Sequence, residues 1–393
     1  MPLFSALARF KNLTSLDCFR ILFDRSHVNV INTLSHLTHA EFTECQWVYR
    51  HHIPYEERMH LQHLLVDHGP NKRRYNWLFN THPNHLTSLT LTSGMPADFI
   101  SGLLPPLPNL ESLEINGIAM VHPEFPSFLS LCPGLIELRV TTDALLPSYV
   151  RAAEDVITMI SPDFIPDLRV YEGPAGFLPA LTRGRLVTHV GVYACPMFMN
   201  TFTMTVGSAF MKQQVRSLKI RVPKVTKRIL ALISYFKAML AVEIVVTNEG
   251  RCMKSRQSYN DILTALDNSV FPPPRHLEYL SIAEESTTWG EPKESPWYDY
   301  QRRLRQHTSL SSSKEHSDSS SSLSSPSSRP IPESEFINKC TSLRYVMLSD
   351  SSRIIAAWNP QLKTDPQHVE IKTFRQWQRQ RLGLLDPIPY GSL

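Results

Sequence analysis

The sequence is poor in glycine and holds none of the short motifs that mark common nucleotide or catalytic sites. Only 14 of its 393 residues are glycine, against 30 prolines. It contains no P-loop, no G-x-G-x-x-G and no G-x-S-x-G elbow, so no local motif selects a nucleotide site or a catalytic serine. The many prolines suit a chain with many short connections that must stop and turn. We therefore expect a protein that is not an enzyme and uses no cofactor.

The sequence also lacks any pair of cysteines with C-x-x-C spacing, and its cysteines are irregularly placed. Such a pattern favours buried free thiols in a reducing compartment over a disulfide framework. The six cysteines are Cys18, Cys45, Cys132, Cys195, Cys252 and Cys340.

No apolar run is long and uninterrupted enough to cross a membrane. The most apolar stretch, residues 229–246, is broken by Lys237 and Glu243, whereas a membrane span needs about 20 apolar residues with few charges. We expect an amphipathic helix that runs into a buried strand there. The N-terminus has neither a long apolar segment nor a small-residue cleavage site. We expect a cytoplasmic or nuclear protein with no membrane partner.

The charge balance does not point to nucleic acid. The net charge is +4, and a nucleic-acid surface needs clustered rather than excess charge. One local cluster exists, and a solvated strand edge with a following helix explains it as well as a binding patch does. Its members are Arg216, Lys219, Arg221, Lys224, Lys227 and Arg228.

What the sequence does contain is a recurring L-x-x-L-x-L pattern, seen most clearly as "LESLEI" at residues 110–115. Successive copies mostly start 22 to 30 residues apart, which matches the period of a leucine-rich repeat. The copy at residue 61 reads equally well as a helix. The copies start at Leu13, Leu37, Leu61, Leu86, Leu110, Leu135, Ile165, Val187, Val215, Met239, Leu277 and Leu343.

Each copy predicts a short strand whose second and third apolar residues point into a core that only stacked neighbours complete. The fold class we expect is α/β: an irregular, curved, leucine-rich-repeat-like solenoid with strands on the concave side and helices or extended returns on the convex side. The alternative is a small enzyme or nucleic-acid binder on a non-repeat α/β fold. The solenoid requires near-complete burial of Leu89, Leu113, Leu138, Leu218 and Leu280.

Regular leucine-rich repeats place an Asn or Cys after each strand to bond the backbone of the turn. Here that position holds Gly94, Ile118, Asp143 and Glu285, so we expect no continuous asparagine ladder.

Composition divides the chain into three parts. Residues 1–290 carry most copies of the pattern, and residues 336–393 hold the last repeat and a C-terminal cap. Between them, residues 291–335 combine a charged helical segment with a serine-rich stretch, in which 13 of the 20 residues at 309–328 are serine. Such a stretch cannot bury a core, so we expect a disordered loop. It is either a phosphorylated tether, with Ser325-Pro326 as one candidate, or a tolerated surface insertion.

With these repeats in place, the chain resembles the leucine-rich-repeat portion of F-box-like proteins of mushroom-forming fungi. The resemblance rests on "LP-x-L-x-x-L-x-I" at residues 107–115, on the return at 126–135, and on "IPDLRVYEGPAGFLPALTRGRLVTHVGV" at 165–192. A terminal segment with Trp358 and Trp377 is a looser match. The likeness implies an intracellular repeat scaffold that binds proteins, as the substrate receptor of a ubiquitin ligase does.

Members of that family carry an F-box ahead of the repeats. Residues 1–12 show no F-box. We therefore expect a ubiquitin-ligase adaptor as a partner only where an F-box is supplied elsewhere, and an unknown protein partner otherwise.

Histidines gather in residues 50–68, beside Glu56 and Glu57. His60 and His63 would share one face of a helix, as metal ligands can. The spacing is not H-E-x-x-H and no cysteine pair completes a site, so we interpret the stretch as a solvated polar helix and expect no metal. The other histidines of the stretch are His51, His52 and His68.

The residues that flank the buried positions should form one continuous concave surface for a partner. We also expect Lys219 and Arg221 to attract an acidic part of that partner. The predicted partner-binding residues are Ser88, Thr90, Ser112, Glu114, Glu137, Arg139, Ser217, Lys219, Arg221, Tyr279 and Ser281.

Overall fold

The structure is a computed structural model of the whole chain. It describes residues 2–47, 54–67, 77–92, 104–120, 122–141, 155–193, 206–207, 214–247, 259–268, 274–285, 335–349 and 354–358. The charged and serine-rich segment 291–334 and the segment around Trp377 lie outside these residues. So do Cys195, Cys252, His51, His52 and His68.

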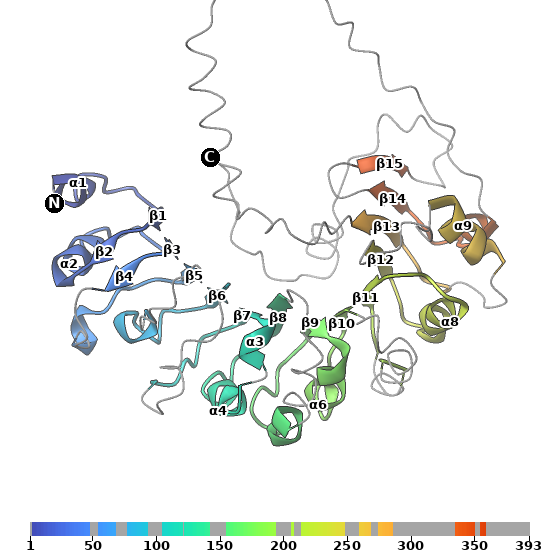
Figure 1. Cartoon of the computed structure of the whole chain (residues 1–393), viewed down its shortest axis with the longest axis horizontal. Coiled ribbons are helices and arrows are strands. Elements are labelled where there is room, and N and C mark those ends of the chain that lie inside the picture. The colour runs from blue at the N-terminus through green and yellow to red at the C-terminus, as the bar shows by residue number, and fades with distance from the viewer. Residues whose placement is uncertain are drawn as a thin grey trace, which may run out of the picture.

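One open sheet of 13 strands runs through the described residues, in the order β1-β3-β5-β6-β7-β8-β9-β10-β11-β12-β13-β14-β15. The first twelve strands are parallel, and β15 joins β14 antiparallel. In Figure 1 the strands follow an arc from β1 to β15. Their bounds are β1 Ser15–Phe19, β3 His39–Thr43, β5 His63–Asp67, β6 Ser88–Leu91, β7 Ser112–Asn116, β8 Glu137–Thr141, β9 Val170–Pro174, β10 His189–Tyr193, β11 Ser217–Val222, β12 Ala241–Thr247, β13 Tyr279–Glu285, β14 Tyr345–Ser349 and β15 Ile354–Trp358.

Short helices lie on the outer side of this arc (Figure 1). Asp24 caps α2 by accepting hydrogen bonds from the backbone of Ser26 and His27, and α4 and α6 carry proline in the first turn, where its missing N–H costs nothing. The helices are α1 Pro2–Leu7, α2 Arg25–Asn32, α3 Gly117–Met120, α4 Phe125–Ser130, α6 Leu178–Thr182, α8 Lys227–Tyr235, α9 Tyr259–Asp267 and α11 Glu335–Lys339, with 3-10 turns η1 Tyr55–Glu57, η2 Leu78–Asn80 and η4 Ala175–Phe177; β2 Leu22–Phe23 and β4 Gln46–Trp47 form a small second sheet.

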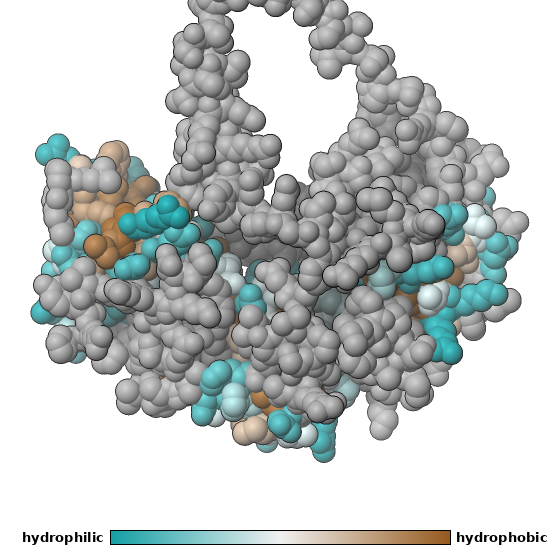
Figure 2. Space-filling model, viewed as in Figure 1, coloured by the Kyte–Doolittle hydropathy of each residue, from teal (hydrophilic) through white to brown (hydrophobic). Residues whose placement is uncertain are grey.

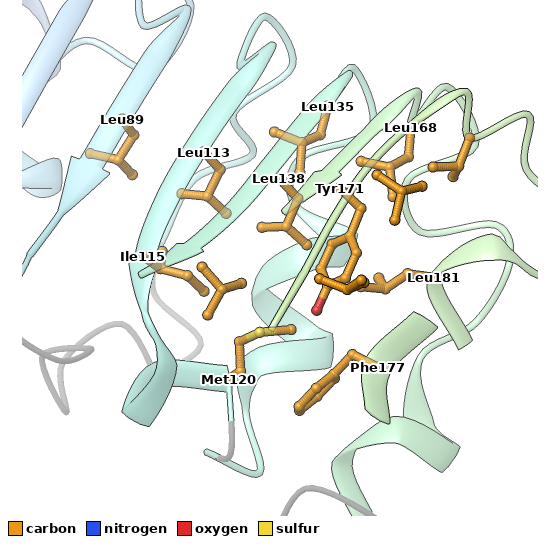
Figure 3. Packing of buried hydrophobic residues seen from close by; sticks show 14 of the residues in the cluster. Leu89, Leu113, Ile115, Met120, Leu135, Leu138, Leu168, Tyr171, Phe177 and Leu181 are labelled. Atoms are coloured by element: carbon orange, nitrogen blue, oxygen red, sulfur yellow. The ribbon is translucent and has the colours of Figure 1, made fainter. Parts of the chain in front are cut away.

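The predicted core positions are confirmed. Leu89, Leu113, Leu138 and Leu218 are fully buried and Leu280 is 1% exposed. Cα pairing places them at the same level on adjacent strands, as in Leu89 opposite Leu113. In Figure 3 the side chains of Leu89, Leu113 and Leu138 point from the strands towards the helices, so the core lies between the sheet and the outer layer.

The backbone repeats as regularly as the core. The residue just before each parallel strand donates its N–H to the carbonyl of the equivalent residue one strand earlier, at 2.7–3.0 Å. Eleven such bonds join the twelve parallel strands without a break. The residues concerned are Thr14, Thr38, Gln62, Thr87, Glu111, Ile136, Arg169, Thr188, Arg216, Leu240, Glu278 and Arg344.

The predicted register of β9 was wrong by three residues. The residue of β9 that is equivalent to Leu113 and Leu138 is Tyr171 and not Leu168, because Tyr171 aligns with Leu138 across the β8–β9 ladder. The Tyr171 ring also takes the space of the next core position, since a Cβ on Gly173 would lie 2.6 Å from its hydroxyl. Its hydroxyl donates to the Pro174 carbonyl at 2.8 Å. One aromatic side chain therefore replaces two aliphatic ones.

The histidine-rich helix was also a wrong prediction. Residues 63–67 form β5, and the described residues before it contain only the 3-10 turn η1. A strand forms here because the alternate residues Leu64 and Val66 are both buried, in register with β3 and β6. By contrast, the predicted helix and strand at 229–246 are confirmed as α8 and β12.

Other predictions concern the thiols and the membrane. Cys18, Cys45, Cys132 and Cys340 are free and buried, as predicted. None of the helices within the described ranges is long and apolar enough to span a membrane. Figure 2 shows an apolar surface at the N-terminal end of the arc, the end that carries the exposed Phe10 and Leu22.

Candidate partner-binding face

The inner face is the side of the sheet opposite the helices. It is made by the first, third and fifth residues of each parallel strand, because side chains alternate between the two faces. All eleven predicted partner-binding residues lie on it. The register sets Ser88, Ser112, Glu137, Ser217 and Tyr279 in one row, Thr90, Glu114, Arg139, Lys219 and Ser281 in the next, and Arg221 in the third.

The inner face is less accessible than alternation alone suggests. We predicted that these residues form a surface, yet six of them are buried: Thr90, Glu137, Arg139, Ser217, Tyr279 and Ser281. Parallel strands lie about 4.8 Å apart, so side chains of one row pack against their neighbours. The five that remain partly accessible are Ser88, Ser112, Glu114, Lys219 and Arg221.

A network of ion pairs runs across the middle of this face, and we call it the charged row. Arg139 on β8 pairs with Glu137 on its own strand and lies 3.5 Å from Glu172 on β9. On β11, Lys219 lies 3.4 Å from Glu172 and 3.2 Å from Glu243 of β12. The row thus ties together side chains from four strands.

A glycine makes the contact between Glu172 and Lys219 possible, although a strand lies between theirs. Glu172 and Lys219 stand on β9 and β11, and Gly191 of β10 lies between them. A Cβ at Gly191 would lie 2.7 Å from Cγ of Glu172, which real side chains do not tolerate. The missing side chain leaves the path along which Glu172 crosses β10 to reach Lys219.

These contacts fix the charge states of the row. Burial alone would raise the pKa of Glu172, but Lys219 and Arg139 outweigh it and hold that pKa at about 2. Burial would lower the pKa of Lys219, yet Glu172 and Glu243 raise it above its ordinary value. Both side chains are therefore charged throughout the physiological range.

Aromatic and cationic side chains flank the row at its C-terminal side. Tyr193 donates its hydroxyl hydrogen to Glu172 at 2.9 Å, and the Arg221 guanidinium lies over the Tyr193 ring, 5.5 Å from its centre. Burial, followed by the charge of Glu172, raises the pKa of Tyr193. The phenol stays protonated and continues to hold the carboxylate.

The sign of the inner face contradicts the predicted attraction of an acidic partner. Lys219 is held between two carboxylates, so it is not a free basic site. Carboxylates also outnumber cations on this face, whereas the whole chain has a net charge of +4. The acidic residues are Asp17, Glu41, Asp67, Glu114, Glu137, Glu172 and Glu243, and the basic ones are Arg139, Lys219 and Arg221.

The N-terminal third of the inner face is the most acidic part. At the inner positions of β1, β3 and β5 there is no Lys or Arg, and Asp17 stands opposite Glu41. Burial raises the pKa of Glu41, and Asp17 and Asp67 raise it further. Beside them the His39 and His63 rings stack at 4.1 Å, and burial lowers the pKa of His63 to about 4, so this pair carries no compensating charge at neutral pH.

The histidines that the structure describes do not assemble into a metal centre. His63 lies on the inner face, while His60 contacts the rings of His82 and His85 at 5.2 and 4.7 Å. Among the residues that the structure describes, no group of three or more His, Cys, Asp or Glu side chains could hold a metal ion.

Sequence reasoning missed Glu172, Glu243, Gly191 and Cys45. Cys45 occupies the Asn-or-Cys position after β3, and its thiol donates to the Cys18 carbonyl at 3.2 Å, so the turn bond expected of regular repeats is present there. The pattern beginning at Leu37 contained this signal, as did the equivalent spacing from Val187 to Cys195.

Comparison with known proteins adds no family to this description. The chain matches no model of a known protein family, and a search of curated proteins found no significantly similar sequence.

Proposed function

We propose that the chain is an irregular leucine-rich-repeat-like solenoid that binds a protein partner on its inner face and carries out no catalysis. The observation that carries this proposal is the single register of the twelve parallel strands, which sets their alternate side chains in unbroken rows. A surface of this kind offers a large contact area that depends on no single pocket.

The backbone bonds before each strand support the repeat interpretation. Eleven equivalent bonds join the strands at one position per repeat, and each strand pairs only with its neighbours in the sequence of repeats. In solenoids each repeat buries its faces against adjacent repeats alone. The same arrangement is expected of the F-box-like repeat proteins that the sequence resembles, and the proposal concerns their substrate-binding surface only.

The free thiols bear on location. Cys18, Cys45, Cys132 and Cys340 are buried and unpaired with one another, which suits a reducing compartment. We therefore place the proposed function in the cytoplasm or the nucleus.

The test compares a change on the inner face with a matched change on the outer side. Ser88 and Ser112 are adjacent, half-buried inner positions, so Ser88→Arg with Ser112→Arg adds two bulky cations there. Ser127 and Thr158 are exposed on the return segments, and Ser127→Arg with Thr158→Arg is the control. Quantitative affinity capture of each full-length form, with mass spectrometry, should show partners that the inner variant loses and the control keeps.

Binding constants of one captured partner, measured with the three purified forms, complete the test. Both variants should unfold at the wild-type temperature. Equal affinity of the wild-type and inner-variant proteins, with loss in the outer variant, would move the binding surface to the convex side and overturn the proposal.

A further inference from the structure

Histidines gather in the N-terminal repeats, and the repeat itself sets them beside one another. Seven of the ten histidines in the described ranges precede β7. The sequence reads "HLTH" at 36–39, "HLQH" at 60–63 and "HLTS" at 85–88, and the leucine is the first apolar residue of each copy of the repeat. Because successive repeats stack in the same orientation, equivalent histidines come to lie on adjacent repeats.

Two histidine stacks result, one on the inner face and one on the returns. In the inner stack the rings of His39 and His63 lie parallel, with their centres 4.1 Å apart. In the outer stack His60 and His85 lie parallel at 4.7 Å, and the His82 ring lies 5.2 Å from His60 and 4.7 Å from His85. The two stacks thus join neighbouring repeats through ring contacts between histidines.

Both stacks suit neutral imidazole better than imidazolium. A protonated ring donates from both nitrogens, yet His63 and His82 each bury an Nδ1 that has no hydrogen-bond partner in the part of the chain that the structure describes. Burial, followed by the neighbouring His39, lowers the pKa of His63 to about 4. Burial, followed by its two histidine neighbours and Arg58, lowers the pKa of His82. Protonation therefore costs each stack an unpaired N–H and a repulsion between adjacent rings.

The charged groups around the stacks do not offset that cost. The carboxylates of β1, β3 and β5 leave the pKa of His63 lowered. On the returns Glu57 is paired with Arg25, and Arg58 adds positive charge beside His82. The other titratable side chains on the same face or the same returns are Asp17, His36, Glu41, Tyr55, Glu56, Asp67 and Glu111.

We propose that the first four strands of the parallel sheet, β1, β3, β5 and β6, form with their returns an acid-labile unit that opens when the two histidine stacks are protonated, while the sheet from β8 onwards stays folded. Each repeat contacts only its neighbours, and among the described strands β1 has a neighbour on one side only, so this end can open alone. The proposal concerns the fold and does not depend on whether the inner face binds a partner.

One further buried histidine lies outside the unit, and one histidine inside it behaves differently. Burial, followed by Arg216, lowers the pKa of His189 to about 4, but β10 has a paired strand on each side. Local opening there breaks two strand interfaces at once. His27 lies inside the unit, bonds Asp24 at 2.7 Å and keeps that partner when it is protonated.

The size of the effect follows from His63. Its pKa is lower in the folded state than in the open state, so its contribution to stability is complete above about pH 6.5 and is lost as the pH falls towards 4. A shift from 6.5 to about 4 multiplies the equilibrium constant for opening by about 20 between pH 7 and pH 5. The pKa values of His39 and His82 are shifted in the same direction and add to this factor.

Buried thiols inside and outside the unit report the opening. Cys18 and Cys45 lie inside it, Cys132 lies beyond it, and all three are buried. The full chain is labelled briefly with a pyridyl disulfide at pH 7 and at pH 5, and mass spectrometry gives the rate at each cysteine. The rate at Cys45 relative to Cys132 should rise about 20-fold or more at the lower pH, because the intrinsic pH dependence of thiol labelling cancels in this ratio.

Glutamine variants identify the histidines responsible, since glutamine is polar and takes up no proton. His39→Gln with His63→Gln should reduce the rise about fivefold or more. His60→Gln with His85→Gln should also reduce it, because His82 then loses its charged neighbours. His189→Gln is the matched control and should leave the rise unchanged.

Circular dichroism at pH 7 shows whether each variant folds, and if the inner-stack variant does not, the outer-stack variant decides alone. A full rise in the folded stack variants would overturn the proposal. So would a wild-type ratio that stays constant between the two pH values, whether because every thiol stays protected or because the whole chain opens at once.

Discussion

Replacing Gly191 with alanine tests whether an absent side chain holds the charged row together. The glycine does not have a positive φ, so alanine fits the backbone itself. The three atoms nearest to the new methyl group all belong to Glu172: Cγ, Cβ and Cδ would lie 2.7, 3.1 and 3.2 Å from it. Cγ is in the middle of the side chain, so Glu172 must leave its position over β10 and lose contact with Lys219.

The size of the effect follows from two opposing contributions. Glu172 and Lys219 side chains are 17% and 31% exposed, and each keeps another partner, Arg139 or Glu243. Losing their mutual contact should cost about 1–2 kcal/mol, between the values for exposed and for buried pairs. Alanine also restricts the unfolded chain more than glycine does, which raises the free energy of unfolding by about 0.4–1 kcal/mol. The net loss in unfolding free energy should be about 1 kcal/mol.

Urea unfolding of four proteins measures this coupling: the wild type, Gly191→Ala, Glu172→Ala, and the double variant. In the Glu172→Ala background the Cγ and Cδ contacts are gone, and a small strand shift relieves the remaining Cβ contact. The cost of Gly191→Ala should then fall from about 1 kcal/mol to close to zero, which gives a coupling free energy of about 1 kcal/mol. An equal cost in both backgrounds would refute the crossing of Glu172 over β10.

Three further predictions concern the core and the acidic end. Leu113→Ala should lower the free energy of unfolding by about 2–5 kcal/mol, as measured by urea titration, because the side chain is fully buried. Tyr171→Phe should cost only about 0.5–1.5 kcal/mol in the same assay, since it removes the bond to Pro174 and keeps the ring. Glu41 has a raised pKa in the folded state, so its contribution to stability is present at low pH and is lost as pH rises through that pKa. Glu41→Gln should therefore stabilise the protein at pH 7 and change little at pH 3. Equal effects at both would contradict a pKa of Glu41 raised by burial and by the charges of Asp17 and Asp67.

The strands were predictable because their signal is local. Two apolar residues at positions four and six of a copy point to one face, and in eleven of the twelve copies these two residues lie within a parallel strand. The copy at Leu61 was ambiguous, since a short apolar run fits a strand or a buried helix segment. The copies of the pattern one period before and after it form β3 and β6, and pairing with them makes this run a strand. A short run does not contain that information.

The register of β9 failed because an aromatic residue changed the pattern. Ile165, Leu168 and Val170 satisfy L-x-x-L-x-L by letter, but Val170 faces inward, opposite Glu137 and His189. The real core residue is Tyr171, and Gly173 stands where a third aliphatic residue was expected. Because the predicted register was wrong by three residues, the predicted inner face did not include Glu172, which lies at the centre of the charged row.

The charged row could not be predicted from any one repeat. Its contacts between strands join residues 24 to 47 positions apart in the chain, from Lys219 with Glu243 to Glu172 with Lys219. A pairwise pattern within a strand cannot reveal that Gly191 opens the path between them. Sequence alone therefore placed the cations on the correct face and assigned that face the wrong sign.

The way these charges are held bears on how the proposed partner would bind. A surface of loose Lys and Glu side chains loses about 0.5–1.5 kcal/mol of side-chain freedom for each one that a partner immobilises. Glu172 is already held by Lys219, Arg139 and Tyr193. Most of its side-chain freedom is therefore lost when the protein folds and not when a partner binds. Ion pairs within the row also leave little charge for long-range attraction. The middle of the inner face is thus suited to discriminating shape and hydrogen bonding, whereas the acidic inner side of β1, β3 and β5 is suited to attracting a basic part of that partner.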